Sequence, residues 1–189
     1  MKILNYPHPT LRHESKPVQQ VDRALREMVR EMFELMYAEN GVGLAANQVD
    51  LPFRLFVMNL SASPDEGEEH VIINPVISRP QGNEEKEEGC LSLPGLYGYV
   101  IRPSKVHLNA FSLSGEEIDE EISGLMARVV QHETDHLDGV LFIDRLSSTA
   151  KMDLESSLEA FLIEYDSQRQ HPTEEQISER LHQLERQYC

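Results

Sequence analysis

The chain has 189 residues and a formal net charge of -16 at neutral pH, from 33 acidic and 17 basic residues. This charge argues against a protein that grips phosphate backbones through a broadly basic surface, and no apolar run approaches the roughly 18 residues that a membrane span needs. Two cysteines are too few for a disulfide framework, which favours a reducing compartment. We therefore expect a soluble protein of the cytoplasm with no membrane contact.

The first predicted element is an amphipathic helix over residues 21–38. Asn40 and Gly41 follow it, and both residue types tolerate the left-handed backbone that ends a helix. A methionine-rich stripe of this kind is typical of a core, although it would also suit an adaptable binding surface. The apolar side chains recur at helical steps of three and four: Val21, Leu25, Met28, Met32, Leu35 and Met36.

The next stretch, GVGLAANQ at residues 41–48, partly matches the G-x-G-x-x-G/A fingerprint of dinucleotide-binding proteins. Such a fingerprint follows a strand and opens a helix, because the phosphate binds at the helix N-terminus. Here a helix precedes the glycines, and Pro52 comes too soon for a proper helix after them. We therefore expect no dinucleotide, and instead expect the glycines to bring backbone and Gln48 close to a site.

Short apolar runs predict strands at residues 53–60, 71–77, 105–113 and about 116–122, and Ser114-Gly115 joins the last two in a hairpin. The acidic segments 65–69 and 84–89 are predicted to be solvated loops. Within the second segment, Glu88 is excepted from this prediction, because it lies two residues before Cys90.

Helical periodicity returns at residues 124–137, with Ser123 as the N-cap and Asp138-Gly139 as the stop. A long helix is predicted from Lys151 to about Arg169, and Pro172 prevents its continuation.

The tail restarts at a capping box, Thr173 to Gln176, and an apolar face follows that can cover the chain's own core or a partner. We expect one catalytic domain over residues 1–170, with residues 171–189 as a helical extension of the same domain. The face consists of Ile177, Leu181, Leu184 and Tyr188.

The segment HETDH, residues 132–136, carries the strongest chemical signal. His132 and His136 lie one helical turn apart on one face, so both imidazoles can reach one cation. Glu133 lies about 100° round the helix, close enough to handle a proton of metal-activated water. Two histidines need a third protein ligand for a catalytic site.

Several residues could supply that third ligand. His171 and His182 lie downstream beyond a helix and a proline, whereas Cys90 would complete a sulfur and nitrogen set that suits zinc or ferrous iron. A lone cysteine is more often a small buried hydrophobe, but together with HETDH the ligand role is favoured. An endopeptidase with a downstream ligand and a non-catalytic metal-stabilised module remain alternatives.

Three stretches together resemble the peptide deformylase family: GVGLAANQ (41–48), EGCLS (88–92) and QHETDH (131–136). The likeness extends over roughly residues 1–148. It implies an α+β fold with antiparallel sheets packed around the helix that carries HExxH, an N-terminal helix and a C-terminal helical extension. The implied reaction removes the N-formyl group from the formyl-methionine of nascent chains and releases formate.

The resemblance also implies residue roles. Cys90, His132 and His136 would bind one divalent metal ion, Fe²⁺ in the cell, with Zn²⁺, Ni²⁺ or Co²⁺ as possible substitutes. Glu133 would act as general base and then acid. The Gln48 amide and the Leu91 backbone N–H would stabilise the oxyanion.

Substrate contacts and ligand orientation involve further residues. Leu125 and Val129 share the face of His132, so they can line a pocket for a methionine side chain, and from spacing alone they can equally be core. Arg102 and Asp135 would form an ion pair that orients the ligands, unless they form a surface pair of little consequence. The other predicted substrate contacts are Val42, Gly43, Leu44 and Gly89.

Two features depart from many family members. The run LPGLYGYVIRP has Tyr97 near the position of an arginine that contacts substrate backbone, and it looks like a subgroup of other bacterial and plastid enzymes. Some members bind the ribosome through a basic C-terminal helix, but residues 151–189 hold nine acids and four bases. Ribosome contact is possible for this chain, but not through such a helix.

Overall fold

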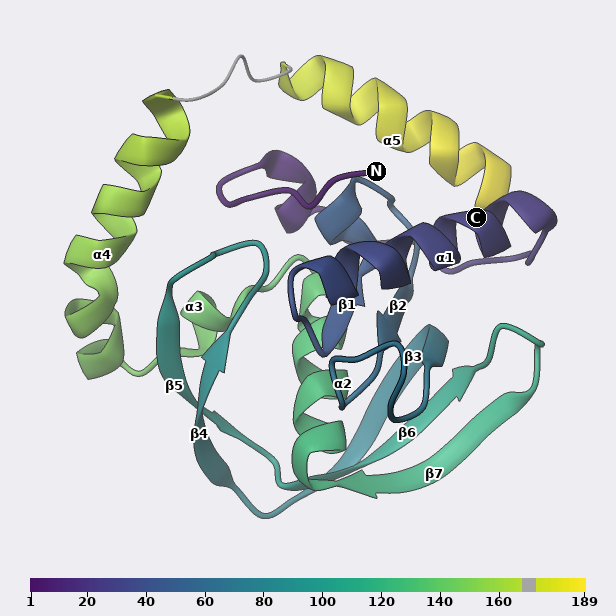
Figure 1. Ribbon diagram of the computed structural model, residues 1–189, viewed down its shortest axis with the longest axis horizontal. Coiled ribbons are helices and arrows are strands. Elements are labelled where there is room, and N and C mark those ends of the chain that lie inside the picture. Colours follow the sequence, from purple (N-terminus) through teal and green to yellow (C-terminus); the bar gives the residue numbers. More distant parts are fainter. Residues whose placement is uncertain (168–172) are drawn as a thin grey trace.

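A computed structural model describes residues 1–167 and 173–189. Two antiparallel sheets lie on either side of a central helix, α2 (Gly124–Leu137), as Figure 1 shows. The larger sheet has the order β1-β2-β3-β6-β7, and the smaller pairs β4 with β5. This arrangement confirms the predicted α+β fold. The strands are β1 Gly43–Ala45, β2 Leu55–Met58, β3 His70–Gln81, β4 Glu84–Gly89, β5 Tyr97–Arg102, β6 Lys105–Phe111 and β7 Glu117–Ser123.

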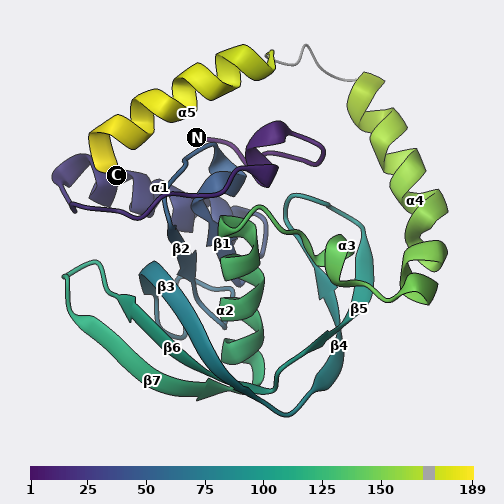
Figure 2. The ribbon, with the colours of Figure 1, turned by 180° about the vertical axis from the view of Figure 1, so that it is seen from behind.

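Four further α-helices and two short 3-10 turns complete the described chain. The helices are α1 Arg23–Ala38, α3 Phe142–Arg145, α4 Ser148–Ser167 and α5 Glu174–Tyr188, and the turns are η1 Pro9–Arg12 and η2 Ala46–Val49. Seen from behind in Figure 2, α1 and α5 lie at one end of α2, and α4 stands beside β5.

The predicted helix boundaries are close to the observed ones. α1 begins at Arg23 rather than Val21, because the Asp22 carboxylate accepts a hydrogen bond from the Leu25 backbone N–H at 2.8 Å and caps the helix there. α2 spans the predicted residues 124–137, but the Ser123 side chain makes no capping hydrogen bond. Gly139, with φ of +71°, follows its end as predicted.

The prediction of a solvated loop at residues 84–89 is wrong, since this segment is β4. Its acidic side chains alternate: Glu85 and Glu87 are exposed, whereas Glu88 is buried and paired with arginines. A strand whose buried face carries a charge lacks the apolar alternation on which the prediction depended. β1 and β5 were not predicted either, because all three residues of β1 are buried and β5 exposes its large apolar side chains.

The core consists of three apolar clusters. The first lies between α1 and the β1–β2 edge of the large sheet, the second between α2 and that sheet, and the third beneath β5 and α3. Met32 and Met36 are fully buried in the first cluster and Met28 packs against it, so the methionine stripe is core.

The C-terminal helix packs against the body of the protein. Tyr188 is 2% exposed and its ring lies edge-on to Phe53, with centroids 4.9 Å apart. Ile177 and Leu181 are also buried, and Leu184 packs against the first cluster, so this face covers the chain's own core. The predicted capping box forms at Thr173, whereas the predicted helix end near Arg169 and the break at Pro172 lie outside the described residues.

Within the described ranges, no helix is both long and apolar enough to cross a membrane.

Candidate metal centre and active site

Cys90, His132 and His136 come together at the centre of the molecule. Cys90 directly follows β4, and the two histidines lie one turn apart on α2. One ligand atom of each residue lies within 4.8 Å of the others, and Cys90 Sγ is 3.2 Å from His136 Nε2. Among the described residues this is the one cluster of three or more potential metal ligands.

The downstream alternatives for a third ligand find no support. His182 hydrogen-bonds within α5 to the Ser178 carbonyl, at 2.7 Å and on an exposed surface, and His171 lies outside the described residues. Cys90 is therefore the candidate third ligand.

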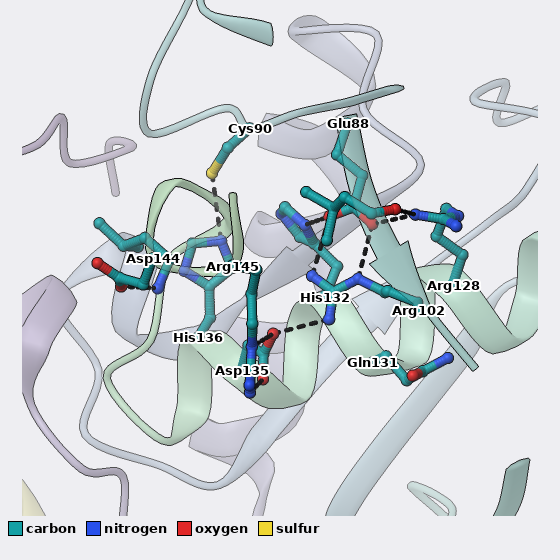
Figure 3. A network of polar contacts seen from close by, with 12 residues as sticks. Glu88, Cys90, Arg102, Arg128, Gln131, His132, Asp135, His136, Asp144 and Arg145 are labelled. Atoms are coloured by element: carbon teal, nitrogen blue, oxygen red, sulfur yellow. Dashed lines mark hydrogen bonds and ion pairs between the residues drawn. The ribbon is translucent and has the colours of Figure 1, made fainter. Parts of the chain in front are cut away.

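Glu88 contacts the His132 ring at Nδ1 and so orients it, as Figure 3 shows. Its Oε2 lies 3.0 Å from His132 Nδ1, which leaves His132 Nε2 for the cluster. Two guanidinium groups hold the carboxylate in place: Arg102 donates to both oxygens, at 2.6 and 2.9 Å, and Arg128 donates to Oε1 at 2.5 Å. A carboxylate that fixes the far nitrogen of a metal-binding histidine sets the tautomer and the ring orientation.

Asp135 and Arg102 form the predicted ion pair, and it is buried. Arg102 donates to Asp135 Oδ2 at 2.7 Å, and their side chains are 5% and 10% exposed. Arg145 of α3 binds the same carboxylate at 2.5 and 3.1 Å. Asp135 thus connects α2 to α3 and, through Arg102, to Glu88.

This network sets the charge of the site. Burial would raise the pKa of Glu88, but hydrogen bonds from His132 and Arg102 lower it to about 2. Burial likewise opposes a charge on His132, yet its hydrogen bonds to Cys90 and Glu88 raise the pKa of that imidazole to about 10. For His136, burial and the charge of His132 both lower the pKa, so this imidazole stays neutral.

The residues fit a divalent cation. A thiol and two imidazoles converge, and a cation would bind them through the deprotonated sulfur and imidazole nitrogens. Glu133 Oε2 is buried and has no hydrogen-bond partner among the described residues. An orphaned carboxylate oxygen in the cavity that Cys90 and His132 also line fits a site built for a further polar group.

Gly43 and Gln48 bring the glycine-rich stretch to this site. A Cβ on Gly43 would lie 2.5 Å from Glu133 Oε1, so only glycine leaves room for that carboxylate. The Ala45 backbone N–H donates to Gln48 Oε1 at 2.8 Å, which turns the amide nitrogen toward Ser92 Oγ (3.1 Å) and Cys90 Sγ (3.5 Å). The stretch itself is a short edge strand followed by one 3-10 turn, unlike the strand–turn–helix of a dinucleotide fingerprint.

A cavity of about 480 Å³ opens above the cluster. Predicted contacts that line it are Val42, Gly43, Gln48, Gly89, Leu91, Leu125, Val129 and Glu133. Leu125 is 51% exposed at its mouth and Val129 is buried in its wall. Leu44 does not line it: the side chain is fully buried in the first core cluster, because alternate residues of β1 point to opposite sides.

Comparisons with known proteins agree with this geometry. The polypeptide deformylase family model matches residues 1–152. The chain belongs to this family. A peptide deformylase of Rhodopirellula baltica is 55% identical over 169 residues, which cover 89% of this chain and 84% of that one. One of Neisseria gonorrhoeae is 48% identical over 147 residues, which cover 78% and 87%.

Solved structures of the family also superpose closely. A plant peptide deformylase matches with a TM-score of 0.87 and 39% identity over 92% of this chain and 95% of that one. The Plasmodium falciparum peptide deformylase matches with a TM-score of 0.85 and 36% identity, over 89% of this chain and 99% of that one. The predicted class is thereby confirmed: this is a metal-dependent hydrolase family that removes the N-formyl group from nascent peptides.

Sequence reasoning missed part of the charged network. In the sequence, Glu88 stands out only by its position two residues before Cys90, and neither Arg128 nor Arg145 has a predicted role. A signal for Glu88 was present in its place within the family-like motif EGCLS. Arg128 and Arg145 carry no such signal, because their partners lie 40 and 10 residues away in the chain.

Proposed function

We propose that the cavity at Cys90, His132 and His136 hydrolyses the formyl amide of N-formyl-methionyl nascent chains, with Glu133 as the proton carrier. The observation that supports this role most directly is the state of Glu133. Its Oε2 is buried without a partner, and burial raises its pKa to about 7 against the opposing charges of His132 and Arg102. A group that titrates near neutral pH can both accept and return a proton.

The three ligands would hold one divalent ion, Fe²⁺ in the cell, and Zn²⁺, Ni²⁺ or Co²⁺ could replace it, because thiolate and imidazole accept all of them. When bound, the ion supplies a Lewis acid that acidifies water and polarises a carbonyl group. Glu88 and Asp135 contribute through orientation: Glu88 holds His132, and the Asp135–Arg102 pair holds Glu88.

Glu133 then carries one proton between two partners. Its carboxylate accepts a proton from water as the water oxygen bonds to the formyl carbon. It returns that proton to the peptide nitrogen as the carbon–nitrogen bond breaks, which yields a free α-amine and formic acid, and the acid loses its proton to water as formate.

Two donors would stabilise the negative charge that develops on the formyl oxygen. The Gln48 amide nitrogen is already turned into the cavity by the Ala45 hydrogen bond, so no reorientation is needed during the reaction. The Leu91 backbone N–H is the proposed second donor, on the residue that follows Cys90 in the cavity wall.

The methionine side chain would lie against Val129, Leu125 and Val42, which line the cavity with apolar surface. The substrate backbone would pair with β1, which lies at the edge of the large sheet and therefore has one side free of strand partners. In this arrangement Leu44 contributes through its backbone only.

We further propose that the protein acts in the cytoplasm on chains emerging from ribosomes, without a basic docking helix. The apolar face of α5 packs on the protein's own core, and residues 151–189 carry more acids than bases.

The test is formate release from formyl-Met-Ala-Ser by protein loaded anaerobically with Fe²⁺, or with Ni²⁺ or Co²⁺. Glu133→Gln should lower kcat by about 10² to 10⁴ while metal content and melting temperature stay unchanged, and exposed Glu120→Gln is the control of equal charge change. Cys90→Ser should lose metal. If the loaded protein releases no formate, or if Cys90→Ser retains metal as tightly, the proposal fails.

A further inference from the structure

The outer face of β5 exposes an apolar stripe. Tyr97, Tyr99 and Ile101 alternate along the strand and are 60%, 57% and 59% exposed. The other face of the strand points inward, where Val100 belongs to the third core cluster and Arg102 to the charged network. Large apolar groups in a row on a solvent-facing surface indicate an interaction site rather than a core.

Unpaired acidic groups border this stripe. Glu87 lies opposite Tyr99 and Glu85 opposite Ile101 on the neighbouring strand, so all four share one face. Both carboxylates are exposed, and neither has a hydrogen-bond or ion-pair partner within residues 1–167 and 173–189. By contrast, Lys86 on the same strand pairs with Glu84 at 2.9 Å.

The stripe continues from the catalytic cavity. Tyr97, Glu87 and Gly89 line the cavity, whereas Tyr99 and Ile101 lie beyond it on the same strand. The Tyr97 ring covers Gly89, where a Cβ would lie 2.7 Å from the ring. A chain that leaves the cavity past Tyr97 therefore meets Tyr99 and then Ile101.

We propose that this face, defined by Tyr97, Tyr99, Ile101, Glu85 and Glu87, binds the part of the substrate chain that follows the first three residues, and that it favours basic and apolar side chains there. The inference rests on the proposed function and names its preferred substrate class. From Tyr97 to Ile101 the strand rises about 13 Å, the length of four extended residues.

Charge decides the preference. The cavity rim also carries exposed Glu39, and the chain as a whole has a net charge of -16. Arg128, the one arginine or lysine that lines the cavity among the described residues, is bound to Glu88. A lysine or arginine of a passing chain can pair with Glu85 or Glu87 and lie over a tyrosine ring, whereas an acidic residue meets only like charge.

The experiment compares three peptides: formyl-Met-Ala-Ser, the same peptide extended by Lys-Leu-Lys, and the same peptide extended by Glu-Leu-Glu. At about 20 mM salt, kcat/KM for the basic extension should exceed that for the acidic one by about tenfold, and about 500 mM salt should remove most of the difference. The change should appear in KM, because the extension does not touch the reacting atoms.

Two variants test the surface. Tyr99→Ser with Ile101→Ser should remove the advantage of the basic extension over formyl-Met-Ala-Ser, and Glu85→Gln should reduce it about threefold, while both leave turnover of formyl-Met-Ala-Ser unchanged. Ile163→Ser on α4, where the side chain is 72% exposed, controls for loss of surface apolar area. Glu120→Gln on β7 controls for loss of one negative charge.

An equal preference for the two extensions would overturn the inference, and so would a preference that both the double variant and Glu85→Gln leave unchanged. If the stripe instead formed a dimer, light scattering would show a dimer that the double variant dissociates, with no change in peptide preference. Failure of the proposed function looks different, because formyl-Met-Ala-Ser itself would then not be deformylated.

Discussion

Gly43 and Glu133 approach one point of the site from opposite sides. The carboxylate of Glu133 fills the space that any other residue at position 43 would need, and its other oxygen has no partner in the described structure. The glycine therefore sets the position of the proposed proton carrier, and its role depends on contact with α2 rather than on backbone freedom.

Gly43→Ala should lower kcat for formyl-Met-Ala-Ser by about 10², because a Cβ 2.5 Å from Glu133 Oε1 must displace that carboxylate. Steady-state kinetics and a thermal melt measure the two effects separately. Gly115→Ala is the control: its φ of +87° lies in a hairpin turn with nothing near the added Cβ, so it should lower stability and leave kcat intact. Equal loss of kcat in both variants would contradict this role.

The two cysteines differ in surroundings, and Cys189 allows a prediction on pH. Burial, with the nearby charge of Glu185, raises the pKa of the Cys189 thiol from 9.0 to about 11. A raised thiol pKa means less reactive thiolate below that pH. The rate of Cys189 alkylation by iodoacetamide, followed by peptide mass mapping, should therefore rise about tenfold per pH unit from pH 8 to pH 10. A plateau below pH 10 would contradict the raised pKa.

At the scale of elements, β4 is a strand whose buried face carries a charged side chain. Glu88 on its inner face is held by Arg102 of β5 and Arg128 of α2, so one carboxylate joins both strands of the small sheet to the central helix. Burial of one carboxylate with two guanidinium groups is tolerated because each is hydrogen-bonded. The same interactions place Cys90, the next residue but one, over the histidines.

α5 is the element for which the structure adds most. It lies outside the residues that the family model matches, yet Tyr188 is buried in the first core cluster and the Tyr188 carbonyl accepts from the Gln19 N–H at 2.9 Å. We propose on this basis that residues 1–170 and the extension from residue 171 unfold as one unit.

Tyr188→Ala should lower the free energy of unfolding by about 3 to 5 kcal/mol, since it leaves a cavity beside Phe53. Urea unfolding followed by both circular dichroism and tyrosine fluorescence measures this, and the two probes should give one transition. Exposed Glu179→Ala on the same helix should cost less than about 0.5 kcal/mol. Loss of the α5 signal in a separate early transition would show that the extension is independent.

For the whole molecule, the dominant property is the net charge of -16. Part of it lies on exposed strand faces, such as Glu85 and Glu87 of β4. Self-repulsion of this kind destabilises the compact state more than the expanded one, and salt screens it.

We expect the melting temperature to rise by a few degrees, about 2 to 5 °C, as sodium chloride increases from about 10 to about 200 mM. Differential scanning calorimetry in sodium chloride and in choline chloride distinguishes general screening, which predicts equal rises, from binding of a specific cation. A fall in melting temperature would show that the ion pairs stabilise the fold more than like charges destabilise it.

The sequence by itself determined the local features of this protein. Helical periodicity placed α1 and α2 to within two residues, and HETDH placed His132 and His136 one turn apart, because spacing along a helix is a local property. Motif resemblance supplied the family, and the capping box placed the start of α5. Only the tertiary structure decided that 84–89 is a strand, that Leu44 faces the core, and that Arg128 and Arg145 serve the site. Those outcomes depend on partners that lie far apart in the chain or on the face that a strand turns inward, and a one-residue shift of a strand would reverse that face.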